Sequence, residues 1–310
     1  MSPSSRERVS VVITTRNESR NIENCLASIK AQTYPAELLE IIVVDNQSSD
    51  DTKALARRHT DKVFDHGPER SAQRNHGFAK ATGDILLFLD ADMILSAGVV
   101  ERSVARLRDQ GFCALYIPEI VLGRGFFPRV RRFERSFYDA TVIDCVRVFT
   151  RPAFEGVGGF DETLTGPEDW DFDKKIRAFG PVGLLSTYDF DQVDRFVSDS
   201  PDAGLVSRLC AFEKTTGLPP LLFHNEAAFE LGRYLTKKTY YGGSFAAYQA
   251  KWPANDPDLA RQFGPFYRYF GVFLENGRWR RMITHPSLAA GMYFLRFLVG
   301  VMFVLSKFKP

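Results

Sequence analysis

The chain lacks the features that mark secreted, disulfide-bonded or nucleic-acid-binding proteins. Its four cysteines (Cys25, Cys113, Cys145 and Cys210) are far apart and form no C-x-x-C pair, so we expect reduced thiols in a cytoplasmic protein. The first apolar run, residues 9–15, is too short for the hydrophobic region of a signal peptide. The net charge of +2 is a small difference between 40 basic and 38 acidic side chains, and it gives no reason to expect a nucleic-acid partner.

Glycine-rich phosphate loops are missing as well. No strand-like run is followed by G-x-G-x-x-G or G-x-x-x-x-G-K-S/T, which removes the main signal for dinucleotide-binding and P-loop proteins. The sequence instead alternates apolar strand-like runs, at residues 9–15, 39–45 and 85–90, with helical patterns such as 69–81. This β-α-β-α order predicts an α/β fold with a mostly parallel central sheet flanked by helices.

Polar and acidic side chains stand where three of these strands end. Because the carboxyl ends of parallel strands meet at one edge of the sheet, we expect these side chains to gather in the crevice where open α/β sheets bind ligands. In Asp90-Ala-Asp92 the two acids point the same way, ~7 Å apart on extended backbone. One carboxylate can therefore bind Mg²⁺ or Mn²⁺ while the other reaches a water or a hydroxyl group. The residues at the three strand ends are Thr14-Thr15-Arg16, Asp45 and Asp90-Ala-Asp92.

A second acidic centre opens a predicted helix. It consists of Glu168-Asp169-Trp170-Asp171, followed by apolar residues at helical spacing. Carboxylates are favoured at a helix N-terminus, so capping alone can account for one of these acids. A role as a catalytic base is the alternative.

Four sequence blocks, in the same order and spacing, resemble the inverting family 2 glycosyltransferases with the GT-A fold. The blocks are VVITTRNE, IIVVDNQSSDDT, RSAQRNHG and LFLDAD, and the similarity covers roughly residues 9–190. The resemblance implies a Rossmann-like sheet and the transfer of one sugar from a nucleoside-diphosphate sugar, UDP- or GDP-linked, to an acceptor hydroxyl. It also implies Mn²⁺ or Mg²⁺ as the cofactor, since a cation offsets charge on the departing diphosphate.

The same resemblance assigns roles to individual residues. Asp169, with Glu168 beside it, holds the position of the catalytic base, which takes the proton of the acceptor hydroxyl. Trp170 then either stacks on a sugar face or belongs to the core. Thr15, Asn17 and Glu18 line the nucleotide pocket, Asp45 hydrogen-bonds the base edge, Arg74 lies near the diphosphate, Asp92 binds the metal, and Asp90 faces the ribose or the metal.

The C-terminal third contains further candidates. His224 ends a short apolar run; a lone histidine is more often structural, but this one resembles the third metal ligand of many GT-A enzymes. Lys237 and Lys238 either clamp the diphosphate as point charges or solvate a helix face. The segment ENGRW at 275–279 departs at its first residue from the Gln-x-x-Arg-Trp signature of processive synthases and lies too far downstream, so we expect one sugar per encounter.

Aromatic and basic residues gather after residue 110. Residues 123–138 interleave arginine and phenylalanine, which predicts either an amphipathic helix with a solvated arginine face or a surface for lipid headgroups or an acceptor phosphate. Residues 288–305 are apolar except for Arg296. As a helix they span ~27 Å, and an arginine at the middle costs ~2.5–3.5 kcal/mol on insertion. An in-plane or re-entrant anchor, or packing beside an aromatic helix expected over residues 263–274, is therefore favoured over a crossing.

These features predict a peripheral or monotopic protein on the cytoplasmic face of a membrane, with a lipid-linked or membrane-proximal acceptor; an aromatic dimer interface is the alternative. We expect a GT-A nucleotide-sugar-binding and catalytic domain over residues 1–226 and a helical, aromatic-rich extension over 227–310. A sugar-nucleotide pyrophosphorylase would need a glycine-rich loop directly after the first strand, where this chain has TTRNE. A non-catalytic sugar-nucleotide-binding protein of the same fold is the other alternative, and the presence of both acid centres together with His224 argues against it.

Overall fold

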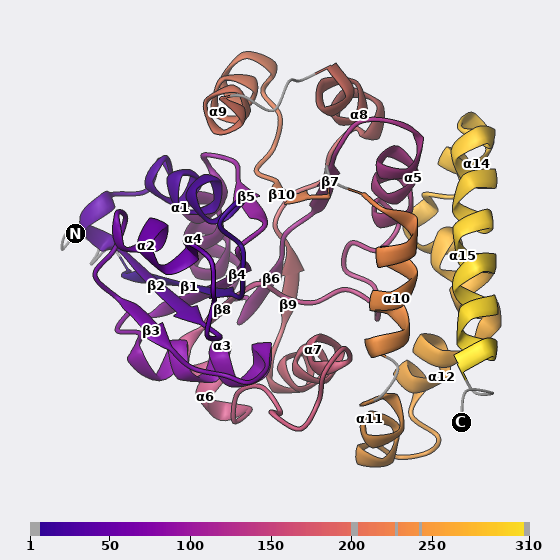
Figure 1. Cartoon of the computed structure of the whole chain (residues 1–310), viewed down its shortest axis with the longest axis horizontal. Helices are drawn as coiled ribbons and strands as arrows, with labels where there is room; N and C mark the ends of the chain where they lie inside the picture. Colours follow the sequence, from indigo (N-terminus) through magenta and orange to yellow (C-terminus); the bar gives the residue numbers. More distant parts are fainter. Residues whose placement is uncertain (1–6, 200–203, 227–228, 242–243, 307–310) are drawn as a thin grey trace.

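The centre of the protein is a β-sheet covered by helices on both faces (Figure 1). The structure, a computed structural model, describes residues 7–199, 204–226, 229–241 and 244–306. The strands of this sheet are β1 (Val9–Thr15), β2 (Leu39–Asp45), β3 (Val63–Asp65), β4 (Ile85–Asp90), β6 (Ala114–Tyr116), β8 (Val148–Thr150) and β9 (Val182–Leu184), in the order β3-β2-β1-β4-β8-β6-β9. β1 pairs in parallel with β2 and β4, whereas β8 runs antiparallel to β4 and β6. The predicted mostly parallel α/β sheet is confirmed.

Two helical layers bury the sheet because its middle strands are apolar at nearly every position. Neighbouring residues of a strand point to opposite faces. Ile13 and Leu87 therefore pack against α1 and α4 on one face, while Val12 and Phe88 pack against α3, α6 and α7 on the other. The helices of this half of the chain are α1 (Ile22–Lys30), η1 (Ala36–Leu38), α2 (Thr52–Arg57), α3 (Arg70–Lys80), α4 (Val99–Gln110), α6 (Arg151–Gly156) and α7 (Glu168–Phe179).

A second, smaller sheet joins three segments that are distant in sequence. Its strands are β5 (Met93–Leu95), β7 (Glu119–Leu122) and β10 (Leu222–Asn225), and β10 lies in the middle, antiparallel to β5 and parallel to β7. The register places His224 opposite Met93, directly after Asp92. The neighbouring helices are α5 (Phe126–Arg135), α8 (Phe190–Asp199) and α9 (Leu205–Thr216).

Helix α5 turns most of its arginines inward, so the prediction of a solvated or lipid-facing arginine surface on this segment is wrong for them. Arg131, Arg132 and Arg135 are at most 17% exposed. Arg132 Nη2 lies 2.8 Å from Asp194 Oδ1, and Arg135 Nη2 lies 2.9 Å from Glu119 Oε2. Since buried charges need partners, these arginines hold α5 to α8 and to β7.

The C-terminal region is helical, as predicted, and shares a hydrophobic core with α5. Phe133 and Phe137 meet Phe273 and Met292 in this core. The helix expected over residues 263–274 is present from residue 265 to residue 274, with a π-helical stretch at η3, and Gly264 separates it from α12. The region contains α10 (Leu231–Tyr241), α11 (Phe245–Lys251), α12 (Pro257–Phe263), η3 (Tyr267–Gly271), α13 (Val272–Leu274), η4 (Glu275–Gly277), α14 (Arg280–Thr284) and α15 (Pro286–Ser306). The domain boundary after residue 226 stays a prediction.

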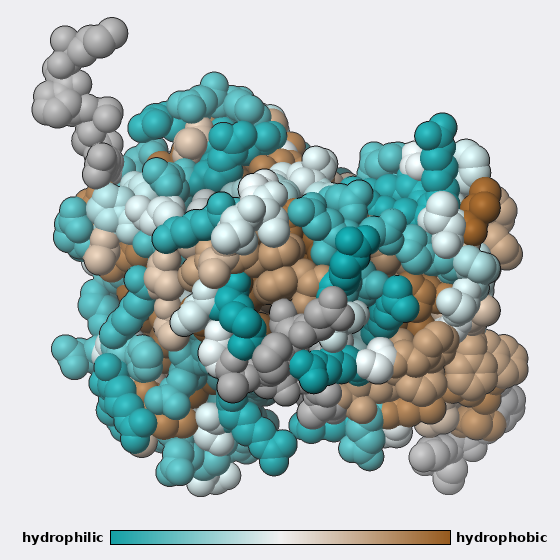
Figure 2. All heavy atoms as spheres, turned by 90° about the horizontal axis from the view of Figure 1, so that it is seen from above, coloured by the Kyte–Doolittle hydropathy of each residue, from teal (hydrophilic) through white to brown (hydrophobic). Residues whose placement is uncertain are grey.

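Apolar side chains gather on the outside of these helices, at the end of the molecule where α15 lies (Figures 1 and 2). We call this the C-terminal apolar surface; its members, each 37–72% exposed, are Phe266, Phe270, Leu274, Phe294, Phe297, Val301 and Leu305. The last four recur at helical spacing and so share one face of α15. Arg296 is buried on another face, with Nε 2.9 Å from Glu134 Oε1. Within the described ranges, no helix has the length and apolarity needed to cross a membrane.

Candidate active site

The loops after β1 and β2 are tied together at the carboxyl edge of the sheet. Asp45 is fully buried, and its carboxylate accepts hydrogen bonds from Ser48 N at 2.7 Å and Ser48 Oγ at 2.5 Å. Asn17, with φ of 55°, donates its N–H to Ser48 Oγ at 2.7 Å, and Glu18 N donates to Thr52 Oγ1 at 2.8 Å. These contacts give the predicted nucleotide-binding residues a fixed frame.

Thr15 belongs to the same edge and carries an unsatisfied group. In the register of the sheet Thr15 lies beside Asp45, at the last residue of both strands. Its Oγ1 is buried and has no hydrogen-bond partner in the described part of the chain. A buried hydroxyl without a partner is costly, so this atom is a candidate contact for a bound ligand.

Arg74 joins the two acidic centres that the sequence predicted. It extends from α3, and its guanidinium is fully buried between the end of β4 and the start of α7. Nη1 lies 2.6 Å from Asp169 Oδ1, and Nη2 lies 3.2 Å from Asp90 Oδ1. The ring of Phe88 is 4.2 Å below the guanidinium, a cation–π contact that fixes its plane. Arg74 therefore faces carboxylates directly, and its predicted place near a diphosphate stays a prediction.

Arg70, one helical turn before Arg74, is a site residue that the sequence analysis missed. Its Nη2 lies 2.8 Å from Glu168 Oε1 and its Nη1 lies 3.5 Å from Asp90 Oδ2. The i, i+4 spacing of the two arginines places them on one face of α3. That spacing in a predicted helix was the available signal. The two arginines and three carboxylates form one connected cluster.

The cluster sets the protonation of its acids. Burial acts to raise the pKa of Asp90 and of Asp169, but Arg74 and Arg70 outweigh it and hold both pKa values below the ordinary aspartate range. Burial raises the pKa of Glu168 above its ordinary value, although Arg70 opposes this. Asp169 is thus ionised at neutral pH, as a general base must be, and its side chain is 24% exposed, which leaves it open to a substrate.

Asp92 and His224, two of the predicted metal ligands, are in contact. Asp92 Oδ2 lies 3.0 Å from His224 Nε2, while Asp92 Oδ1 is buried and has no hydrogen-bond partner among the described residues. Burial acts to lower the pKa of His224, but Asp92 and Glu119 outweigh it and raise this pKa well above the ordinary value. A carboxylate with an unsatisfied oxygen beside an imidazole fits a divalent cation.

Asp90 fits the same cation less well. Its Oδ1 accepts a hydrogen bond from Thr14 Oγ1 at 2.9 Å and also faces Arg74, while its Oδ2 faces Arg70. In the ranges that the structure describes, no group of three or more histidine, cysteine or acidic side chains is arranged to hold a metal. A cation would therefore rely on Asp92 and His224 as its protein ligands.

Trp170 lies among aromatic side chains of the C-terminal helices. Its ring is stacked 6.0 Å from Phe245 and meets Phe263 edge-on at 6.1 Å, and its Nε1 donates to Ile143 O at 3.3 Å. These contacts favour the packing role over the sugar-stacking role, which stays a prediction. Lys237 and Lys238 belong to α10, but their side chains lie outside the described part of the structure.

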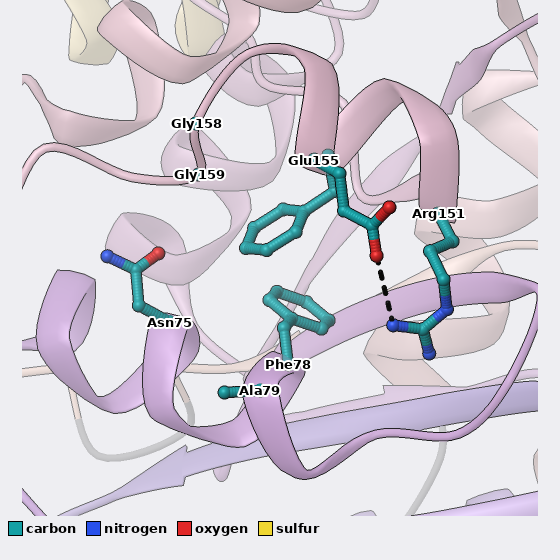
Figure 3. A pocket seen from close by; sticks show the side chains of 8 residues that line it. Asn75, Phe78, Ala79, Arg151, Glu155, Gly158 and Gly159 are labelled. Atoms are coloured by element: carbon teal, nitrogen blue, oxygen red, sulfur yellow. Dashed lines mark ion pairs between the residues drawn. The ribbon is translucent and has the colours of Figure 1, made fainter.

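A pocket of about 380 Å³ lies apart from these carboxylates, between α3 and α6 (Figure 3). Phe78 and Phe154 form its apolar wall, and Arg151 pairs with Glu155 at its rim, at 3.6 Å. None of the predicted site residues lines it. We therefore place the candidate active site at the edge of β4 and not in this pocket.

The fold and the carboxylate cluster define a domain of the GT-A type, a class whose sheet presents acids at the carboxyl end of its strands. Residues 10–154 match the model of Glycosyl transferase family 2. Glycosyltransferase AglE of Haloferax volcanii is 37% identical over 110 residues, which are 33% of this chain and 36% of AglE. Residues 10–154 therefore form a domain of glycosyl transferase family 2. The chain spans less than half of the length of the curated relatives that it first matches.

Solved structures share the fold. The mannosyltransferase PcManGT from Pyrobaculum calidifontis, in complex with GDP-Man and Mn²⁺, matches with a TM-score of 0.54 and 22% identity, covering 99% of this chain and 83% of PcManGT. TarS 1–349 of S. aureus, in complex with UDP-GlcNAc, matches with a TM-score of 0.50 and 18% identity, covering 87% and 89% of the two chains. At these identities the likeness concerns the fold alone.

Proposed function

We propose that the chain is an inverting hexosyltransferase that moves one sugar from a UDP- or GDP-linked donor to an acceptor hydroxyl, with Asp169 as the general base. The observation that carries the proposal is the contact chain at the end of β4. Arg74 joins Asp169 to Asp90, and two residues further on Asp92 contacts His224. A candidate base and a candidate cation site thus flank one strand end.

Transfer with inversion needs one base and one displacement. The acceptor oxygen forms a bond to the anomeric carbon as its proton moves to Asp169, and the bond from that carbon to the diphosphate oxygen breaks, so that the electron pair leaves with the diphosphate. Arg74 keeps Asp169 ionised and oriented for this step, and Arg70 holds Glu168 beside it. General-base catalysis of this kind contributes ~10²–10⁴-fold.

Asp92 and His224 are the residues that would hold a divalent cation. A bound Mn²⁺ or Mg²⁺ supplies charge neutralisation for the leaving diphosphate. Support comes from the unsatisfied Oδ1 of Asp92 in this chain. PcManGT, which shares the fold, was solved with GDP-Man and Mn²⁺. The donor nucleotide can be guanosine or uridine, since PcManGT was solved with GDP-Man and TarS with UDP-GlcNAc.

A lipid-linked or membrane-proximal acceptor is the part of the proposal that rests on the C-terminal apolar surface. An exposed apolar face of this kind marks an interaction site. Replacing Phe294 and Phe297 together by serine should reduce sedimentation with phospholipid vesicles. The matched control is Phe179→Ser, a change at a phenylalanine that is 47% exposed on α7. Equal binding of both variants and the unchanged chain would remove the membrane from the proposal.

The test of the catalytic assignment separates donor binding from transfer. A panel of UDP- and GDP-sugars with Mn²⁺ first identifies a donor by calorimetry. Asp169→Asn should then bind that donor with unchanged affinity while its transfer rate falls by ~10²–10⁴-fold. Asp161→Asn, a change on the segment before α7 where Asp161 pairs with Lys251, is the control and should transfer normally. Unimpaired transfer by Asp169→Asn would refute the role of this residue.

A further inference from the structure

Glu119 stands behind His224 on the side away from Asp92. His224 Nδ1 lies 3.0 Å from Glu119 Oε1, and His224 Nε2 lies 3.0 Å from Asp92 Oδ2. The Glu119 side chain is 7% exposed. The imidazole is therefore held between two carboxylates, one of which has no place in the proposed reaction.

The small sheet explains why these three residues meet. Asp92 precedes β5, Glu119 begins β7, and His224 belongs to β10 between them. In the register of β10 and β7, Glu119 is opposite Leu222, two residues before His224. Residues related in this diagonal way stand on the same face of a sheet and are within reach of long side chains. Asn225 N also donates to Asp92 O at 2.8 Å, which fixes the backbone on the other side.

Glu119 is itself held from two directions. Arg135, on α5, places Nη2 2.9 Å from Glu119 Oε2, and Arg147, just before β8, places Nη2 3.2 Å from the same oxygen. Both arginines contact Oε2, so Oε1 is left for the histidine. A carboxylate between two guanidinium groups stays ionised and can only accept hydrogen bonds.

We infer that Glu119 is a positioning residue that sets the tautomer and the ring orientation of His224 for cation binding. Because Glu119 accepts from Nδ1–H, the nitrogen that faces Asp92 is Nε2, which is then the one available to a cation. Carboxylates that hold a ligating histidine in this way raise its basicity, and their loss typically weakens metal affinity by ~10–100-fold. The inference rests on the proposed function, because it concerns the same cation.

A purely structural role is the competing explanation, since Glu119 also neutralises two buried arginines. Asp144 provides the matched control. It is 3% exposed, and its Oδ1 lies 3.0 Å from the same Nη2 of Arg135, but it makes no contact with His224 in the described structure. Asp144→Asn therefore removes a comparable buried charge from Arg135 and leaves the support of the histidine intact.

The experiment measures Mn²⁺ affinity by electron paramagnetic resonance, for Mn²⁺ alone and with UDP or GDP, on the full chain. Glu119→Gln, which keeps the shape but loses the charge, should weaken Mn²⁺ binding by about 10-fold or more. Glu119→Asp keeps the negative charge beside the two arginines, but the shorter side chain no longer reaches Nδ1 of the histidine. This variant should therefore also weaken Mn²⁺ binding. Asp144→Asn should bind Mn²⁺ like the wild type, even where its thermal stability falls.

The outcomes distinguish this inference from the proposed function. If Asp92→Ala abolishes Mn²⁺ binding while Glu119→Gln and Glu119→Asp leave it unchanged, the proposed cation site stands and the positioning role is refuted. Equal weakening by Glu119→Gln and Asp144→Asn also refutes it, because the effect is then a general loosening around Arg135. If the wild type binds no Mn²⁺ with either nucleotide, the cation leaves the proposed function and the inference falls with it.

Discussion

Replacing Arg74 by methionine removes a buried cation from between two carboxylates. In the wild type, Arg74 lies 2.6 Å from Asp169 and 3.2 Å from Asp90. One pair of unit charges about 4 Å apart is worth about 4 kcal/mol at an effective dielectric constant of 20, and the desolvation of the guanidinium offsets part of this. Removing one partner of a buried pair costs about 3–5 kcal/mol. We therefore expect the free energy of unfolding to fall by about 3–5 kcal/mol at pH 7.

The loss should depend on pH. With Arg74 present, the pKa values of Asp90 and Asp169 lie below the ordinary value of 3.8. The stabilisation is therefore complete above that value and is lost as the pH falls through the lowered pKa values. In the variant, burial acts with less opposition, so both pKa values rise. The difference in stability between wild type and variant should be largest near pH 7. It should narrow as the pH falls first through the raised pKa values of the variant and then through the lowered pKa values of the wild type.

Urea unfolding across this pH range, together with the pH profile of transfer, measures both effects. The acidic limb of the transfer rate should move to higher pH in Arg74→Met, because Asp169 must be ionised to act as a base. Arg74→Lys is the control, since its ammonium keeps the charge but, as a point charge, lacks the fork that reaches two carboxylates; it should lose less stability than the methionine variant. A methionine variant with wild-type stability at pH 7 and an unmoved acidic limb would refute this account of Arg74.

Three further changes test the packing around the site. Arg296→Met breaks the buried pair with Glu134 and should lower the free energy of unfolding, measured in urea titrations, by about 3 kcal/mol. This is the low end for a broken buried pair, because Glu134 keeps its contact with Arg131 at 2.6 Å. An unchanged free energy of unfolding would show that the buried arginine is not stabilising. Burial acts to raise the pKa of Glu40, but hydrogen bonds from a lysine and a hydroxyl group lower it to about 2. Glu40→Gln should therefore cost about 2–3 kcal/mol at pH 7, and the cost should shrink as the pH falls from 4.5 toward 2; a cost independent of pH would contradict the assignment. Gly77→Ala should lower stability by about 1–3 kcal/mol in thermal unfolding, because the added carbon would press on a valine of β1; an unchanged melting temperature would show that α3 can shift away from the sheet.

Local sequence patterns were sufficient to predict the central sheet and the residues at its edge. Apolar runs such as residues 85–90 need burial on both faces, and parallel order then brings their carboxyl ends together. Asp169 begins α7 and does not end a strand, so its place beside Asp90 on Arg74 did not follow from this rule. The prediction that Asp92 and His224 lie together depended on the family resemblance. The strand that carries His224, β10, is too short to be predicted from its own sequence pattern.

The residues that support the site could not be predicted, because their roles depend on tertiary partners. Glu119 appeared as a single acid before an apolar run, and only the small sheet places it beside a histidine. The arginines of α5 have the spacing of a solvated helix face, yet acids from β7 and α8 make that face internal. The break at residue 264 did carry a local signal, since Gly264-Pro265 favours an interruption between two helices.

The most direct test of the central claim is a structure of the chain with Mn²⁺ and the donor that the binding panel identifies. The account predicts a cation bound to Asp92 and His224, with the diphosphate on it and the anomeric carbon facing Asp169. A donor bound in the pocket between α3 and α6, or one whose sugar lies away from Asp169, would contradict it.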